Sequence, residues 1–172
     1  MSKSGEALSK ALVVAPNAAL SVFRTIMDVA IDGAGPLPGA RKAAGVTLNR
    51  KGEVEAAIDA LVRSHIGMAG TQGFLANLGG WVTIPVALPA NMGALATLQA
   101  RMVAAISHLR GYDVDDPRVR TAIFTCLLTQ DSVDELIRNE KIPSTPMAMA
   151  TAPVSDPELE KTVATHVVET LG

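Results

Sequence analysis

A run of 35 residues without a single charged side chain, Ile66–Ala100, constrains the fold of this chain more than any other feature. A helix that spans a membrane needs about 20 consecutive apolar residues. Here glycines recur through the first half of the run, and polar residues and prolines interrupt the rest, at Gln72, Asn77, Pro85, Pro89 and Asn91. Each uninterrupted stretch is therefore too short to cross a bilayer comfortably.

Two locations are compatible with this run. Helices at the centre of a bundle are surrounded on all sides and carry no charge, because burying a charge is costly. Alternatively, the run forms a re-entrant or interfacial hairpin that turns near Trp81, since an indole ring favours the membrane interface. The membrane contacts expected for that hairpin are Leu78, Trp81, Ile84 and Leu88. Composition alone favours the buried core over membrane contact.

The residue composition favours helices over sheets. Hydrophobic residues make up 48% of the chain but aromatic residues only 3%, so the apolar bulk comes from Ala, Val, Leu, Ile and Met. Small side chains suit helices that pack closely, whereas strands favour β-branched and aromatic residues. We expect an all-α fold, a compact multi-helix bundle around a central uncharged helical hairpin with arms at Ile66–Leu78 and Ala90–Arg110.

Capping and periodicity signals give the boundaries of most helices. Apolar residues at helical spacing predict helices from Asn17 to about Ile31, from Glu53 to about Met68, and from Pro89 to Gly111. Further helix starts are predicted at Asp116-Pro117, at a capping box Ser132–Glu135 and at a second capping box Ser155–Glu158. Residues 33–45 are rich in Gly and Pro and predict a connector with one helical turn around Arg41–Ala44. No strand is expected.

These signals divide the chain into three parts. We expect a helical domain over residues 1–141, a Pro-rich linker over residues 142–154 and a C-terminal amphipathic helix over residues 155–172. The net charge of −2 and the absence of a basic tract argue against nucleic acid as a partner. A single cysteine, Cys126, in an apolar setting predicts a buried thiol and a reducing, intracellular location.

Several spaced motifs resemble those of one family. The chain is similar to the EcsC family of bacterial proteins in Gly73–Pro89, Leu98–Ile106, Gly111-Tyr112-Asp113 and Asp116–Arg120, which occur in the family's order. The resemblance extends over about Val54–Leu128. It implies a helical, membrane-proximal bacterial protein, since the family is associated by name with an operon for an ABC transporter, and it supplies no catalytic residues.

Polar residues near the uncharged run are the candidate ligand contacts. The candidates are Arg101, His108, Asn77, Asn91 and Gln99. In the functional interpretation, Arg101, assisted by His108, holds an anion such as a lipid phosphate beside an apolar groove. In the structural interpretation, which the sequence favours, Arg101 pairs with a carboxylate such as Asp113 or Asp116 and fixes the end of its helix.

No motif of catalysis, metal binding or nucleotide binding is present. His65, His108 and His166 lack the local spacing of metal ligands. The acidic residues 113–116 lack the glycine and the closing glutamate of an EF-hand, and helix capping explains them. Gly67–Gly73 has no following Lys-Ser/Thr, which a phosphate-binding loop requires. We therefore expect no catalytic residues, no metal and no cofactor.

These observations lead to two hypotheses. The first is a non-enzymatic, membrane-associated or lipid-interacting helical protein, cytoplasmic and peripheral at the inner face of the cell membrane. Its partner would be a membrane lipid or a membrane protein complex. The alternative is a soluble protein–protein interaction module or a self-assembling homo-oligomer. An enzyme with an unfamiliar site ranks third, because no nucleophile or acid–base pair stands at a recognisable spacing.

Overall fold

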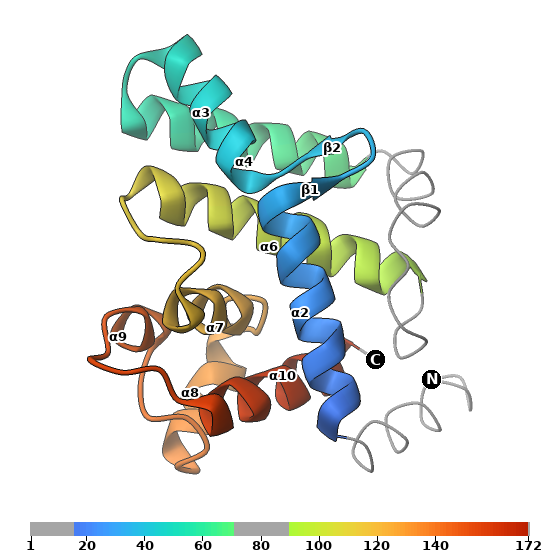
Figure 1. Cartoon of the computed structure of the whole chain (residues 1–172), viewed down its shortest axis with the longest axis vertical. Helices are drawn as coiled ribbons and strands as arrows, with labels where there is room; N and C mark the ends of the chain where they lie inside the picture. Colours follow the sequence, from blue (N-terminus) through green and yellow to red (C-terminus); the bar gives the residue numbers. More distant parts are fainter. Residues whose placement is uncertain (1–15, 71–89, 172) are drawn as a thin grey trace.

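The computed structural model describes residues 16–70 and 90–171 and is all-α, as expected (Figure 1). The only strands in this part of the chain are β1 (Gly33–Ala34) and β2 (Leu37–Pro38), which have two residues each and pair with one another in antiparallel orientation. The helices are α2 (Pro16–Asp32), α3 (Ala40–Lys51), α4 (Val54–Gly70), α6 (Ala90–Leu109), α7 (Pro117–Thr125), α8 (Gln130–Arg138), α9 (Pro146–Ala150) and α10 (Pro157–Leu171).

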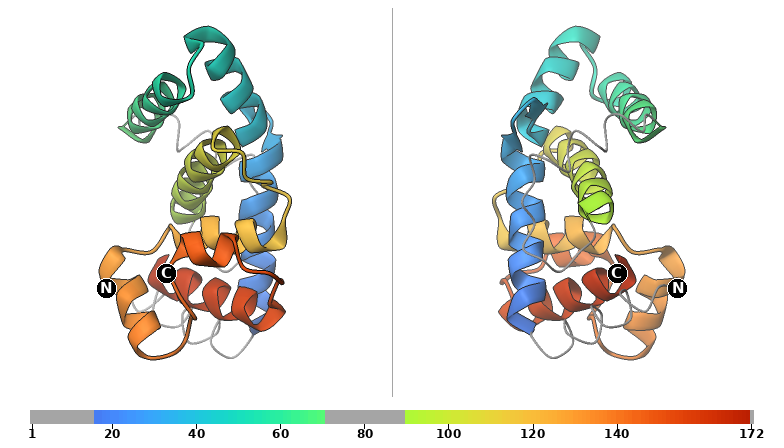
Figure 2. Two further views of the ribbon diagram at one scale, coloured as in Figure 1. Left: turned by 90° about the vertical axis from the view of Figure 1, so that its left-hand side faces the viewer. Right: turned by 90° about the vertical axis from the view of Figure 1, so that its right-hand side faces the viewer.

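Helix α6 lies at the centre of the molecule. It packs against α2, α3, α4 and α7. Figure 2 shows α6 between a layer made of α3 and α4 and a layer that contains α7, α9 and α10, while α2 runs alongside and joins the two layers. The last third of the uncharged run, the first eleven residues of α6 up to Ala100, therefore belongs to a helix surrounded by other helices.

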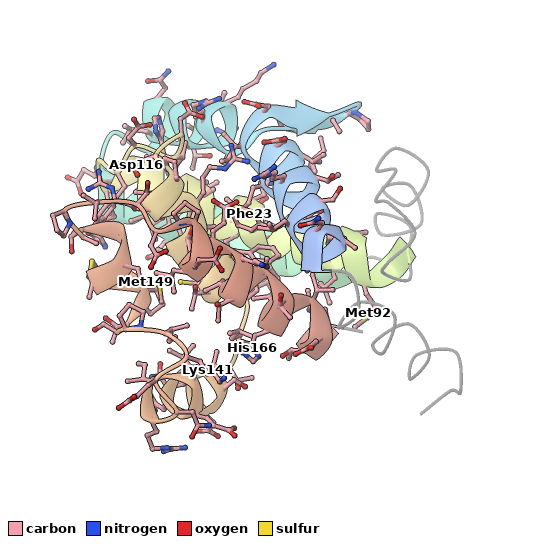
Figure 3. The ribbon with its side chains drawn as sticks, turned by 60° about the horizontal axis from the view of Figure 1, so that its bottom comes forward. Phe23, Met92, Asp116, Lys141, Met149 and His166 are labelled. Carbon is pink, nitrogen blue, oxygen red and sulfur yellow. The ribbon has the colours of Figure 1, made fainter. Side chains whose placement is uncertain are left out.

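Alanine allows these close contacts around α6. Its buried face is built mainly from Ala94, Ala96, Ala100, Ala104 and Ala105. Larger side chains fill the space between α2 and α7, where the rings of Phe23 and Phe124 meet edge to face with centroids 4.8 Å apart. Figure 3 shows Phe23 in the interior, between α2 and the lower helices. The shortage of aromatic residues thus reflects a core of closely approaching helices.

The turn between α2 and α3 depends on glycine. Gly33 has a φ of +91°, and a Cβ atom on Gly39 would lie 2.1 Å from the carbonyl oxygen of Ile31. The expectation of a connector with one turn of helix at Arg41–Ala44 was wrong, because α3 extends over 12 residues. The prediction counted Gly45 as part of the connector, but Gly45 lies within α3, where a helix tolerates one glycine at a modest cost.

Three helix starts were predicted from capping residues, and in two of them the structure uses a different capping residue. Asp116 caps α7 as expected, and its carboxylate accepts a hydrogen bond from the Arg118 amide at 2.9 Å. Helix α8 starts three residues earlier than predicted, because Thr129 rather than Ser132 is the capping residue. At α10 the carboxylate of Asp156, not the Ser155 hydroxyl, accepts from the first amides of the helix. Each time a neighbouring side chain of the same capping chemistry took the role.

The Pro-rich segment 142–154 is packed against the rest of the protein. Ile142 and Met149 are buried, and α9 lies against α7. Helix α10 buries Val163 and Val167 in the same core as α2 and α7. The segment that we expected to be a linker therefore contains a helix of its own, and α10 completes the core instead of standing apart from it.

Candidate functional site

An apolar pocket lies between α4 and α6. Its volume is about 170 Å³, and its lining is formed by His65, Ile66, Leu95, Leu98, Gln99 and Met102. Ile66 is 66% exposed. The buried stripe of α4 is formed by Ala57, Leu61 and His65. Most of the lining thus comes from the first residue of the uncharged run and from its last part, which the fold brings together.

His65, which lines this pocket, forms a buried pair with Arg101, which does not line it. Each residue is only 4% exposed. The Nη1 group of Arg101 donates to His65 Nε2 at 2.7 Å, and its Nε group donates to the carbonyl oxygen of Pro38 at 2.6 Å. His65 Nδ1 donates to the carbonyl oxygen of Leu61 at 2.8 Å. These bonds connect α4, α6 and the end of β2.

The hydrogen bonds fix the state of the His65 ring. The Leu61 carbonyl can only accept, so Nδ1 carries the proton, and Arg101 can only donate, so Nε2 carries a lone pair. The ring is therefore neutral. Burial lowers the pKa of His65, the Leu61 carbonyl opposes this effect, and the charge of Arg101 lowers the pKa further. Burial also lowers the pKa of the Arg101 guanidinium.

The expected pairing of Arg101 with Asp113 or Asp116 was wrong. Asp116 forms an ion pair with Arg118. The side chain and the backbone amide of Arg118 both donate to the Asp116 carboxylate, which lowers the pKa of the Asp116 carboxyl to about 2. Asp113 accepts from the Asp115 amide. Within residues 16–70 and 90–171, Arg101 forms no ion pair with a carboxylate.

The remaining predicted contacts are spread over different places. Gln99 is exposed at the edge of the pocket. His108 is exposed two turns further along α6, where it faces the charge of Asp115 and not Arg101. Asn91 lies in the first turn of α6. Outside the described residues lie Asn77, Leu78, Trp81, Ile84 and Leu88.

Sequence reasoning missed the role of His65. It stands 36 positions before Arg101, and only the packing of α4 on α6 brings the two side chains together. One signal was available: His65 follows Leu61 by four residues, on the same helical face, directly before the uncharged run. A polar residue on a buried face needs a hydrogen-bond partner, and Arg101 is the first charged residue after the run.

Cys126 is exposed, contrary to the expectation of a buried thiol. It borders a shallow hollow together with Val103, Ala122 and Met147. Partial desolvation in these apolar surroundings raises the pKa of the thiol. Because the thiolate is the reactive form, a raised pKa makes Cys126 a weak nucleophile at neutral pH.

Comparison with models of known families, with curated proteins and with solved structures gave no match for this chain. The resemblance to the EcsC family therefore remains a prediction from the spaced motifs. Over residues 16–70 and 90–171, no helix combines the length and the apolar character needed to cross a bilayer. In the same part of the chain, no group of three or more His, Cys, Asp or Glu side chains is placed to hold a metal ion.

Proposed function

We propose that this chain is a non-enzymatic, lipid-interacting helical protein that binds peripherally at the cytoplasmic face of a membrane. One observation carries the proposal: an apolar pocket opens between α4 and α6, and Ile66 is exposed at its edge. An exposed apolar hollow is costly in water and is a common feature of sites that receive apolar ligands. Residues 71–89, which lie between α4 and α6 in the sequence, are also uncharged.

The pocket fits part of a lipid. Pockets that enclose a whole drug-sized ligand have volumes of about 300–1,000 Å³. The pocket here, at about 170 Å³, is smaller, so it accepts a segment of one acyl chain and leaves the rest outside. Each methylene buried contributes about 0.8 kcal/mol, so a few methylene groups suffice for weak, reversible binding.

The resemblance to the EcsC family supports the same proposal, because it implies a position near a membrane. The resemblance extends over both helices of the pocket, since it covers about Val54–Leu128. Its motifs include Leu98–Ile106, which holds three pocket residues and Arg101. Membership of that family is part of the proposal.

Replacing Ile66 tests the proposal. Ile66→Ser removes apolar surface at the pocket without disturbing the core, since the side chain is 66% exposed. We expect binding to anionic vesicles, measured by co-sedimentation and by the fluorescence of the single tryptophan, to weaken about tenfold. Val46→Ser is the matched control, because Val46 is 49% exposed on α3 and does not line the pocket.

Two results would contradict the proposal. One is a wild-type protein that binds neither vesicles nor a fluorescent fatty acid. The other is an equal loss of binding in the Ile66→Ser and Val46→Ser variants. If lipid binding is absent and the sedimentation mass rises with protein concentration, the self-assembling module becomes the better account.

A further inference from the structure

The pocket between α4 and α6 has a lining without charge. Four of its six lining residues carry hydrocarbon or thioether side chains: Ile66, Leu95, Leu98 and Met102. Among the residues that the structure describes, the other two that line it are His65 and Gln99. The sequence from residue 66 to residue 100, which connects the two walls of the pocket, contains no Asp, Glu, Lys, Arg or His. A ligand in this pocket therefore meets apolar surface and neutral polar groups.

His65 has both ring nitrogens engaged in hydrogen bonds within the protein. Its Nδ1 group donates to the carbonyl oxygen of Leu61 at 2.8 Å, and its Nε2 atom accepts from Arg101 at 2.7 Å. An imidazole has only these two hydrogen-bonding positions. A ligand therefore contacts the neutral ring through its carbon atoms, and His65 offers it neither a charge nor a free donor.

The two arginines that flank the uncharged run are held in other contacts. Arg101 is 4% exposed, is bonded to His65 and to the carbonyl oxygen of Pro38, and does not line the pocket. The exposed side chain of Arg63 pairs with Asp59 on its own helix, with 3.6 Å between nitrogen and oxygen. An exposed pair of opposite charges is screened by water and acts weakly on a third charge. Neither arginine gives the pocket a charge that could recognise a head group.

Gln99, at the edge of the pocket, does not select a charge either. Its amide both donates and accepts hydrogen bonds, so it can face an anion, a cation or a neutral hydroxyl. Moving an ionised group from water into apolar surroundings is costly, whereas burying a methylene group is favourable. An amphiphile therefore gains by inserting its hydrocarbon end and leaving its head group in water near Gln99.

We propose that the pocket binds the terminal hydrocarbon segment of a single-chain amphiphile, methyl end first, and does not recognise the head group. This inference rests on the proposed function and names the part of the lipid that is bound. Anionic, neutral and cationic amphiphiles with the same chain then bind alike. A chain with a charge at both ends is excluded, because one charge would have to enter the pocket.

Four ligands with ten-carbon chains test the inference, with dissociation constants measured by displacement of a fluorescent fatty acid at pH 7.5, below any micelle-forming concentration. We expect decanoate, decanol and decyltrimethylammonium to bind within about threefold of one another, since an exposed charge contributes little. Decanedioate should bind at least about 100-fold more weakly than decanoate, because its second carboxylate would lose its hydration in the pocket.

Two variants locate the bound chain and its head group. Ile66→Ser should weaken the binding of the first three ligands by the same factor, because all three bury the same hydrocarbon. Gln99→Glu places an anion at the edge of the pocket and should make decyltrimethylammonium bind about two- to fivefold more tightly than decanoate. The same substitution at Gln130, an exposed residue at the start of α8, is the matched control and should create no preference.

The outcomes separate this inference from the proposed function. A spread of more than about threefold among the first three ligands in the wild type overturns the inference and leaves the lipid pocket in place. Binding of decanedioate within about 100-fold of decanoate does the same, because a charged end would then be accepted in the pocket. If neither the fluorescent fatty acid nor any of the four ligands binds, the proposed function fails as well.

Discussion

His65 and Arg101 show how one hydrogen-bond network sets two protonation states. The carbonyl of Leu61 holds the proton on Nδ1, and the remaining lone pair of the ring accepts from Arg101. A second proton on the ring would place two donors face to face at 2.7 Å and two positive charges side by side. The pair is therefore stable only while the imidazole is neutral.

This network makes the stability of the protein depend on pH. The pKa of His65 is lowered in the folded state, so below 6.5, the ordinary pKa of a histidine, the unfolded chain binds the extra proton first. The contribution of His65 is present above pH 6.5 and is lost as the pH falls through the folded pKa. We expect the free energy of unfolding, measured with urea, to fall between pH 7.5 and pH 5.5.

Replacement of the imidazole isolates this effect. In His65→Gln the amide oxygen can still accept from Arg101, but nothing titrates at that position, so part of the pH dependence should disappear. His108→Gln, at an exposed position of α6, should keep it. Identical pH profiles for the wild type and His65→Gln would show that the network has no such role.

At the scale of elements, the turn from α2 into α3 shows why some boundaries were missed. A glycine that a turn requires and a glycine that is tolerated within a helix look alike in the sequence. Gly39 is required because a side chain there would collide with the backbone of Ile31 and Asp32, whereas Gly45 has nothing within 4 Å. The difference depends on the neighbouring backbone, which the local pattern does not contain.

The two glycines therefore respond in opposite directions to the same substitution. Gly45→Ala should stabilise the protein by about 0.5–1 kcal/mol, because alanine favours the helix and meets no obstacle. Gly39→Ala should be strongly destabilising, since its Cβ would lie 2.1 Å from a carbonyl oxygen. Thermal and urea unfolding of both variants measure this contrast. A destabilised Gly45→Ala would mean that α3 does not continue through residue 45.

At the scale of the whole molecule, composition and periodicity predicted the all-α fold and the central place of α6. The starts of α2, α4, α6 and α7 lie within one residue of the predicted ones, as at the Asp116 cap of α7. The partner of Arg101 could not be predicted, because it depends on how α4 packs against α6 across 36 positions of sequence. The packing of residues 142–154 was missed for a similar reason: prolines mark a break in a helix, but they do not show whether the segment is buried.

The central claim, that the pocket between α4 and α6 receives an acyl chain, is tested most directly by photo-crosslinking. A fatty acid with a diazirine near the end of its chain would be bound, irradiated and located by peptide mass spectrometry. We expect labelling on the peptides of α4 and α6 that carry Ile66, Leu95 and Met102, and competition by unlabelled decanoate. Labelling confined to α8, α9 or α10, or scattered without competition, would contradict the account.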